Sequence, residues 1–241
     1  MRLIYSSQID DTVTYTPVSE NANYPVENIY SQRLSKKYRT TGDTAESIIM
    51  DAGLGNTIKA NSFTIAGHNF TSAATLHIQA NAADAWGAPT LDETITWAAE
   101  TIAAFFTLTD LRYWRFTMVD AANTDTYLEM GNLKLAEYLQ ITKGPARGVT
   151  LKKTDTTQSF MSGGGQYFAT QGYTVRNGSL NFPHWTNAVA ATYETMLDAV
   201  INAVPVVMVI DENNMDIIFP IYCIIAGNYD KTELKNGSYG W

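Results

Sequence analysis

Charged side chains are scarce in this 241-residue chain, and basic ones are scarcer than acidic ones. Only 17% of the residues are charged, against about a quarter in average globular proteins. Sixteen Lys and Arg stand against 24 Asp and Glu, which gives a net charge of −8. Because nucleic-acid binding needs clustered cations to displace phosphate counterions, we expect neither DNA nor RNA as a main partner. The densest basic stretch, residues 33–39, is predicted to be a solvated loop rather than a phosphate contact.

Cysteine is nearly absent, and long apolar runs are missing. The single thiol, Cys223, excludes an internal disulfide framework and is expected to be a small buried hydrophobe. The longest apolar run, residues 217–226, falls far short of the ~20 residues that span a bilayer. The apolar stretch in residues 1–6 is too short for a secretory signal. The sequence therefore predicts a soluble chain without membrane insertion.

Histidines at catalytic or metal-ligand spacing are also lacking. The three histidines, His68, His77 and His184, show no His-x-x-x-His pattern. No nucleophile elbow, Walker loop or dinucleotide fingerprint occurs either. The glycines at 163–165 lack the Lys-Ser/Thr that would complete a phosphate cradle.

Carboxylates give no stronger signal for catalysis. Glu194 and Asp198 stand four residues apart and would share one helix face, which favours a solvated surface over a metal or acid/base pair. Residues 211–216 are rich in oxygen ligands but lack the Gly and closing Glu of a calcium loop, so a hairpin turn is expected. We therefore predict no catalytic residues, no metal site and no cofactor, and a protein that is not an enzyme.

What is present is a series of short strand-like runs over the first 140 residues. Apolar runs or alternating apolar residues occupy 47–51, 62–66, 75–80, 94–97, 104–108 and 113–118. Leu76 and Ile78 are expected to point inward and His77 outward, because side chains alternate along a strand. Such runs separated by turn residues predict a β-sandwich or barrel over residues 1–140. Gly144-Pro145 marks the end of this domain.

The second domain, residues 145–241, is predicted to be β-rich with one helix. Asn177-Gly178 favours a hairpin turn between two strands. An apolar stripe at helical spacing predicts a helix over residues 186–204, ended by Pro205. The strand at the C-terminus is expected to expose an open edge that a partner subunit would complete. The fold class is thus mainly β, with an N-terminal β-sandwich and a C-terminal α+β domain.

Trp86 is the strongest candidate for ligand contact. It lies in a polar loop bounded by Gly and Pro, with Asp84 two residues before it. The indole could stack on a sugar with Asp84 as hydrogen-bond acceptor, or it could pack back over the edge of the sandwich. Trp97 and Trp114 fall in expected strands and are predicted to belong to the core.

Several short motifs resemble the galactose-binding, discoidin-like sandwich. They are an extended Tyr-Pro-x-x-Asn stretch at residues 24–28, Asp51 with Gly53, the turn at residues 67–69 and a closing strand at residues 131–135. The turn at 67–69 is similar to versions of this fold carried by bacteriophage virion proteins. The resemblance implies a jelly-roll fold over residues 20–140. The order of elements after residue 145 is similar to the ring-forming modules of phage tail proteins, which implies assembly into homo-oligomers.

These observations lead to one preferred hypothesis and two alternatives. The preferred one is a structural protein of a bacteriophage tail tip or baseplate, made in the host cytoplasm, that contacts copies of itself and other virion tail proteins. The first alternative is a carbohydrate-binding module that recognises a host surface glycan through Trp86 and Asp84. The second is a hydrolase of cell-surface polymer, for which only scattered carboxylates offer support.

Overall fold

A computed structural model describes residues 1–141, 150–172, 174–180, 185–201, 203–211, 213–215, 220–225, 232–234 and 238–240. The chain forms two compact units. The first comprises residues 1–142 and 194–227, and the second comprises residues 143–193 and 228–241. The division differs from the predicted domains because residues 194–227 join the first unit; the predicted boundaries stay a prediction.

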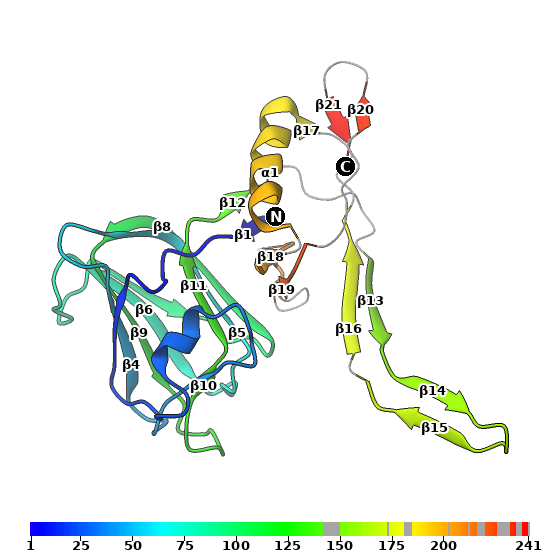
Figure 1. The fold of residues 1–241 in the computed structure, drawn as a ribbon. Coiled ribbons are helices and arrows are strands. Elements are labelled where there is room, and N and C mark those ends of the chain that lie inside the picture. The colour runs from blue at the N-terminus through cyan, green and yellow to red at the C-terminus, as the bar shows by residue number, and fades with distance from the viewer. Residues whose placement is uncertain are drawn as a thin grey trace. The chain divides into compact units, whose positions relative to one another are not determined.

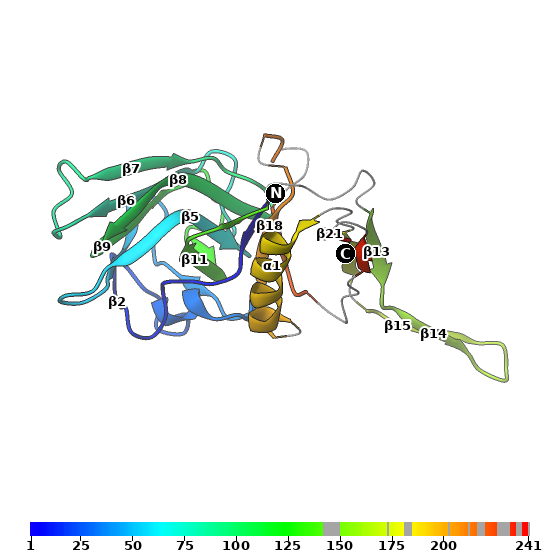
Figure 2. The ribbon, with the colours of Figure 1, turned by 90° about the horizontal axis from the view of Figure 1, so that it is seen from above.

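The first unit is built around a β-sandwich of two antiparallel sheets (Figures 1 and 2). The larger sheet has the order β2 (Thr14–Pro17), β4 (Glu46–Asp51), β9 (Tyr113–Val119), β6 (Thr75–Asn81) and β7 (Leu91–Ile95). The smaller sheet has the order β11 (Asn132–Ala136), β5 (Ile58–Ala66) and β8 (Thr101–Leu111). A two-stranded sheet pairs β3 (Tyr38–Arg39) with β10 (Glu129–Met130). The mainly β fold class and the N-terminal sandwich are confirmed.

The core between the two sheets follows from the alternation in the sequence. Leu76 and Ile78 of β6 are fully buried while His77 between them is only partly buried, as the period of two predicts. Phe63 of β5 and Phe116 of β9 meet across the sandwich with ring centroids 4.9 Å apart. Trp114 is also fully buried, as predicted. Trp97 is not in a strand: it follows β7 and packs against the core from a loop, where its Nε1 donates to the Phe70 carbonyl at 2.9 Å.

The outer face of the smaller sheet is covered as well. A four-stranded sheet with the order β12 (Leu139–Gln140), β1 (Arg2–Ile4), β18 (Val206–Val209) and β19 (Ile221–Cys223) belongs to the same unit. Ile4 of β1 and Val207 of β18 form a second, smaller core with Ala136 of β11. Residues far apart in the sequence thus close over one side of the sandwich. Cys223 is half-buried, and burial raises the pKa of its thiol to about 11, so it is unreactive at neutral pH.

The second unit consists of ribbons and a small sheet. β13 (Thr150–Asp155) pairs with β16 (Thr174–Ser179), and β14 (Gln158–Met161) pairs with β15 (Tyr167–Thr170). β21 (Ser238–Gly240) lies between β17 (Trp185–Thr186) and β20 (Thr232–Leu234). The expected open edge at the C-terminal strand is therefore wrong, because β21 is paired on both sides. The predicted Asn177-Gly178 turn is also wrong: both residues lie inside β16, where Asn177 pairs with Lys152 and Gly178 with Leu151.

Two helical elements complete the chain. α1 (Asn187–Val200) confirms the predicted helix in a shorter form, and the Val189 amide lies 3.5 Å from the Thr186 hydroxyl at its start. Tyr193, Met196, Leu197 and Val200 are buried at helical spacing. The short 3-10 helix η1 (Val26–Tyr30) replaces the expected extended stretch from residue 26 onward, whereas Tyr24 forms a β-bridge with Asn21 and Pro25 is extended. His184 and the boundary at residues 144–145 lie outside the described residues.

Candidate functional site

The loop at residues 81–90 holds the two residues that the sequence singled out. The Trp86 Nε1 donates to Asp84 Oδ1 at 2.7 Å, so the expected hydrogen-bond acceptor is engaged by the indole itself. Asn81 fixes the loop from its start, since its Nδ2 donates to the Ala85 carbonyl at 2.6 Å and its Oδ1 accepts from the Thr90 hydroxyl at 3.2 Å. Trp86 is half-buried and Asp84 is exposed. Sugar binding by this pair stays a prediction.

Trp86 lies against a row of polar side chains on the outer face of the larger sheet. The Arg115 guanidinium lies 4.5 Å from the centroid of an indole ring, within cation–π range. Arg115 donates from Nε and Nη2 to Gln79 Oε1, at 2.8 and 2.6 Å. Gln79 in turn donates to Asp92 Oδ2 at 2.9 Å. The indole therefore packs back over the sheet and leaves one part of its surface to solvent.

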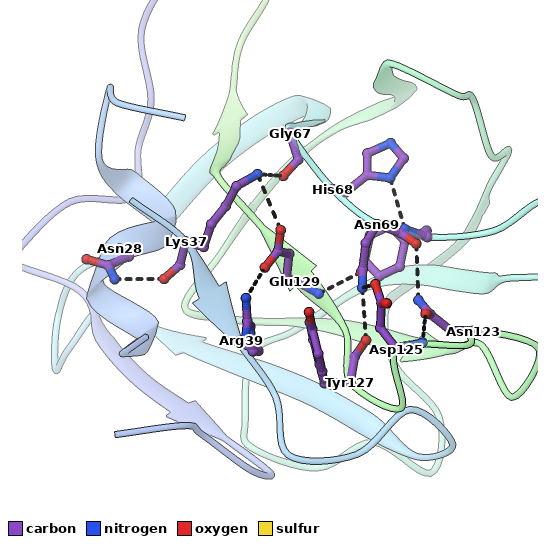
Figure 3. Close-up of polar contacts among 11 residues, drawn as sticks. Asn28, Lys37, Arg39, Gly67, His68, Asn69, Asn123, Asp125, Tyr127 and Glu129 are labelled. Carbon is purple, nitrogen blue, oxygen red and sulfur yellow. Dashed lines mark hydrogen bonds and ion pairs between the residues drawn. The ribbon is translucent and has the colours of Figure 1, made fainter. Parts of the chain in front are cut away.

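A second polar cluster joins the loop before β3 to the segment around β10 (Figure 3). Arg39 donates to Glu129 at 2.8 Å, and its guanidinium lies between the rings of Tyr24 and Tyr127, 4.1 and 4.0 Å from their centroids. Lys37 donates to the Gly67 carbonyl and lies 3.8 Å from Glu129. Half of the predicted solvated loop is thus held in ion pairs, whereas Arg33 and Lys36 are exposed as expected.

Asn69 is the centre of the same cluster (Figure 3). Its side-chain Nδ2 donates to Asp125 and to the Tyr127 carbonyl, at 3.1 and 3.0 Å, while its Oδ1 accepts from the Glu129 amide at 2.8 Å. Its own carbonyl accepts from Asn123 at 3.1 Å. These bonds use every polar group of the Asn69 side chain on the protein itself. We infer that this cluster ties loops together.

His68 lies beside this cluster and does not resemble a catalytic base. Burial lowers the pKa of its imidazole to about 4, the Ala98 carbonyl opposes this shift, and Lys37 adds to it. Its Nδ1 accepts from the Phe70 amide at 3.2 Å. The imidazole is therefore neutral at physiological pH and holds its proton on Nε2.

The other candidate carboxylates are surface or turn residues. Asp198 is exposed on α1. Asp211 accepts from the Asn213 amide and from Asn214 Nδ2, at 3.0 and 2.6 Å, which is the geometry of a turn. In the described part of the chain, no three His, Cys, Asp or Glu side chains gather as a metal site requires. Nor does any helix in that part have the length and apolarity to cross a membrane.

The solved structures that are similar to part of this chain include sugar-binding modules. A family 32 module from C. perfringens NanJ, in complex with galactose, covers 57% of this chain and 99% of its own, at 15% identity and a TM-score of 0.43. A Streptococcus pneumoniae fucose binding module matches over 55% of this chain and 95% of its own length, at 11% identity and a TM-score of 0.43. The family 32 module of AlyQ, in complex with 4,5-unsaturated mannuronic acid, matches over 56% of this chain and 97% of its own length, at 20% identity and a TM-score of 0.40. No family model and no curated protein matches the sequence. At these identities and TM-scores the likenesses carry no argument about what this chain binds.

The most unusual surface lies on residues 156–172, which we call the arm. The arm contains β14, β15 and the Gly-rich turn between them, and none of its residues is charged. Phe160 pairs with Phe168 and Met161 with Tyr167 across the two strands. All four side chains are exposed, by 61%, 44%, 69% and 68% respectively.

Both faces of the arm are apolar near its tip. The Phe160 and Phe168 rings stack on one face with centroids 5.2 Å apart, and because side chains alternate, Met161 and Tyr167 lie on the other. Figure 1 shows the arm as a narrow ribbon that continues from β13 and β16. Sequence reasoning recognised the turn at residues 163–165 but missed the arm. The signal was available, since apolar pairs flank the glycines at equal distances on both sides.

Proposed function

We propose that this protein is a structural, non-catalytic assembly protein that associates with further copies of itself through the arm. The observation that supports the proposal is the exposure of four large apolar side chains on a two-stranded ribbon. An isolated two-stranded ribbon is marginally stable in water, and contiguous exposed apolar surface marks an interaction site. Partner contacts on both faces would bury these side chains.

The charge distribution favours a second copy as the occupant. Two copies that each carry a net charge of −8 repel one another over most of their surface. The arm lacks charge, so contact there avoids that repulsion. Among the described strands, β14 and β15 pair only with each other, so each also has a free edge. Proteins usually protect such edges with Lys or Pro, and the arm contains neither.

The oligomeric state of the purified full chain tests this proposal. We expect the wild type to show a multiple of the 26.6 kDa chain mass by sedimentation, with a concentration-dependent distribution. The double variant Phe160→Ser/Phe168→Ser is expected to associate at least tenfold more weakly. Leu54→Ser is the matched control, because Leu54 is 90% exposed but lies in the first unit. A wild type that stays monomeric at all concentrations, or equal effects of the two changes, would contradict self-association through the arm.

We further propose that the assembly is part of a bacteriophage tail tip or baseplate. This finer proposal is supported by the sequence resemblance alone, at residues 20–140 and in the element order after residue 145. Its test is mass spectrometry of purified virions from a host that carries the gene. Detection of the chain in stoichiometric amounts would support it, and absence from the particles would refute it.

Carbohydrate binding by the sandwich is a second candidate function. It is favoured by the half-buried indole of Trp86 beside hydrogen-bonding groups of Arg115 and Gln79, a combination that suits a sugar ring. Trp86→Ala is expected to lose at least tenfold in affinity for any glycan that the wild type binds on an array. Trp86→Ala binding as tightly as the wild type would exclude this site.

A further inference from the structure

A pocket lies on the outer side of β11, within the first unit. Leu133 and Leu135 belong to the main core, so the alternation of the strand turns Asn132 and Lys134 to the opposite face. The pocket has a volume of about 210 Å³. Its polar lining includes Tyr5, Ser6, Ser7, Tyr30, Asn132 and Lys134. The covering segments come from the N-terminus, from the region around η1 and from Val204.

Lys134 is a buried cation in this lining. Only 4% of the surface of this residue is exposed. None of the described residues forms an ion pair or hydrogen bond with its ammonium group. Burial lowers the pKa of the amine to about 8, which leaves most of it protonated at neutral pH. A buried ammonium without a partner is unfavourable, and an anion in the pocket would relieve that cost.

Asn132 lies beside Lys134 in the same wall and anchors the loop that follows η1. It is 3% exposed, and its Nδ2 donates to the Ser31 carbonyl at 2.9 Å. Its Oδ1 accepts no hydrogen bond from the described residues, but this atom has almost no accessible surface and does not face the open pocket. Because Asn132 and Lys134 are two residues apart on one strand, their backbones are about 7 Å apart. Lys134 is the charged group that this wall presents to the pocket.

We propose that this pocket binds a small hydroxylated monocarboxylate, such as a sugar acid, with its carboxylate on Lys134. The ligand carboxylate supplies the partner that the Lys134 ammonium lacks among the described residues. The hydroxyls of Ser6, Ser7 and Tyr30 line the same space and can bond further ligand hydroxyls. Asp10 also lines the pocket, and its negative charge disfavours a dianion such as phosphate. The volume suits one ring rather than a chain of them.

Calorimetric titration of the full-length protein tests the proposal, with galacturonate as the probe and galactose as its neutral counterpart. We expect galacturonate to bind at least tenfold more tightly than galactose at pH 7. Lys134→Met, which keeps the length of the side chain without the charge, is expected to lose this preference and to remain folded. Lys36→Met is the matched control, since Lys36 is exposed and outside the pocket, and should bind like the wild type.

The pH dependence adds a readout that a structural role of Lys134 would not produce. Above pH 8 the amine loses its proton, so galacturonate affinity should fall about tenfold per pH unit, and Lys134→Met should show no such fall. The other titratable groups of the lining are Asp10, Tyr5 and Tyr30; burial raises the pKa of Tyr30 above its usual value, which keeps that hydroxyl neutral over this range.

A short oligogalacturonide distinguishes two sources of the ligand. Binding of the monomer alone points to a free acid, and equal binding of both points to the end of a polysaccharide. Equal affinity for galactose, unchanged binding in Lys134→Met, or no binding of galacturonate would overturn the proposal. It stands or falls independently of assembly through the arm, because the sedimentation test involves neither Lys134 nor Asn132.

Discussion

At the scale of single residues, burial decides which charged pairs matter. Arg39 and Glu129 are largely shielded from solvent, with side chains 23% and 19% exposed, and the rings of Tyr24 and Tyr127 enclose the guanidinium. The hydrogen bond that Arg39 donates to Glu129 raises the pKa of Arg39 above its ordinary value. Lys59 and Glu137 form a pair of similar distance, 3.0 Å, but both side chains are 47% exposed. Screening by water makes the second pair much weaker.

This difference predicts unequal effects of the same substitution. Glu129→Gln is expected to lower the free energy of unfolding by about 1–3 kcal/mol, because it leaves a partly buried guanidinium without its carboxylate. Glu137→Gln should change it by less than about 0.5 kcal/mol. Urea denaturation of both variants at neutral pH measures the contrast. Equal losses in the two variants would show that shielding of Arg39 and Glu129 contributes nothing.

His68 predicts a stability change with pH. Its folded pKa of about 4 lies below the ordinary value of 6.5, so the unfolded chain takes up the proton first as the pH falls. Stability from this group is therefore full above about pH 6.5 and declines toward pH 4, with a loss of about 1–2 kcal/mol by pH 5. His68→Asn keeps an acceptor for the Phe70 amide and removes the titration. Urea denaturation at pH 7.5 and pH 5 should show a smaller difference in the variant; an identical difference would refute a neutral buried His68.

At the scale of elements, alternation identified the strands of the sandwich but not their partners. β6 and β9 were predictable because each places Leu, Ile, Phe or Trp on one face at a period of two, and β4 because it contains a short apolar run. The hairpin turn predicted at Asn177-Gly178 was wrong because turn propensity is a local property. Pairing of β16 with β13 over six residues stabilises an extended chain there. The buried Lys134 was hidden for a related reason. Its cover comes from residues 5–10 and 204, which no local pattern connects to β11.

Gly131, between β10 and β11, shows why a glycine is needed where these elements meet. A Cβ at this position would lie 2.9 Å from the Leu34 carbonyl oxygen and 3.1 Å from the Leu34 Cα. Both are backbone atoms that cannot turn aside. Gly131→Ala is therefore expected to cost about 1–3 kcal/mol in unfolding free energy. Gly87→Ala, where no atom lies within 4 Å, should change it by less than about 0.5 kcal/mol, and thermal or urea unfolding compares the two. A neutral Gly131→Ala would mean that the loop at Leu34 moves away freely.

At the scale of the whole molecule, the arm is uncharged and the rest of the chain carries the net charge. Assembly through the arm should therefore become tighter as the salt concentration rises. Each copy carries a net charge of −8, and repulsion between copies extends over about 30 Å at 0.01 M salt but only about 8 Å at 0.15 M. Contacts made by Phe160 and Phe168 contain no ion pair that salt could weaken. Self-association is therefore expected to tighten several-fold between 0.02 and 0.3 M NaCl, as measured by sedimentation of the wild-type chain. Weaker association at higher salt would mean that charged groups outside the arm hold the copies together.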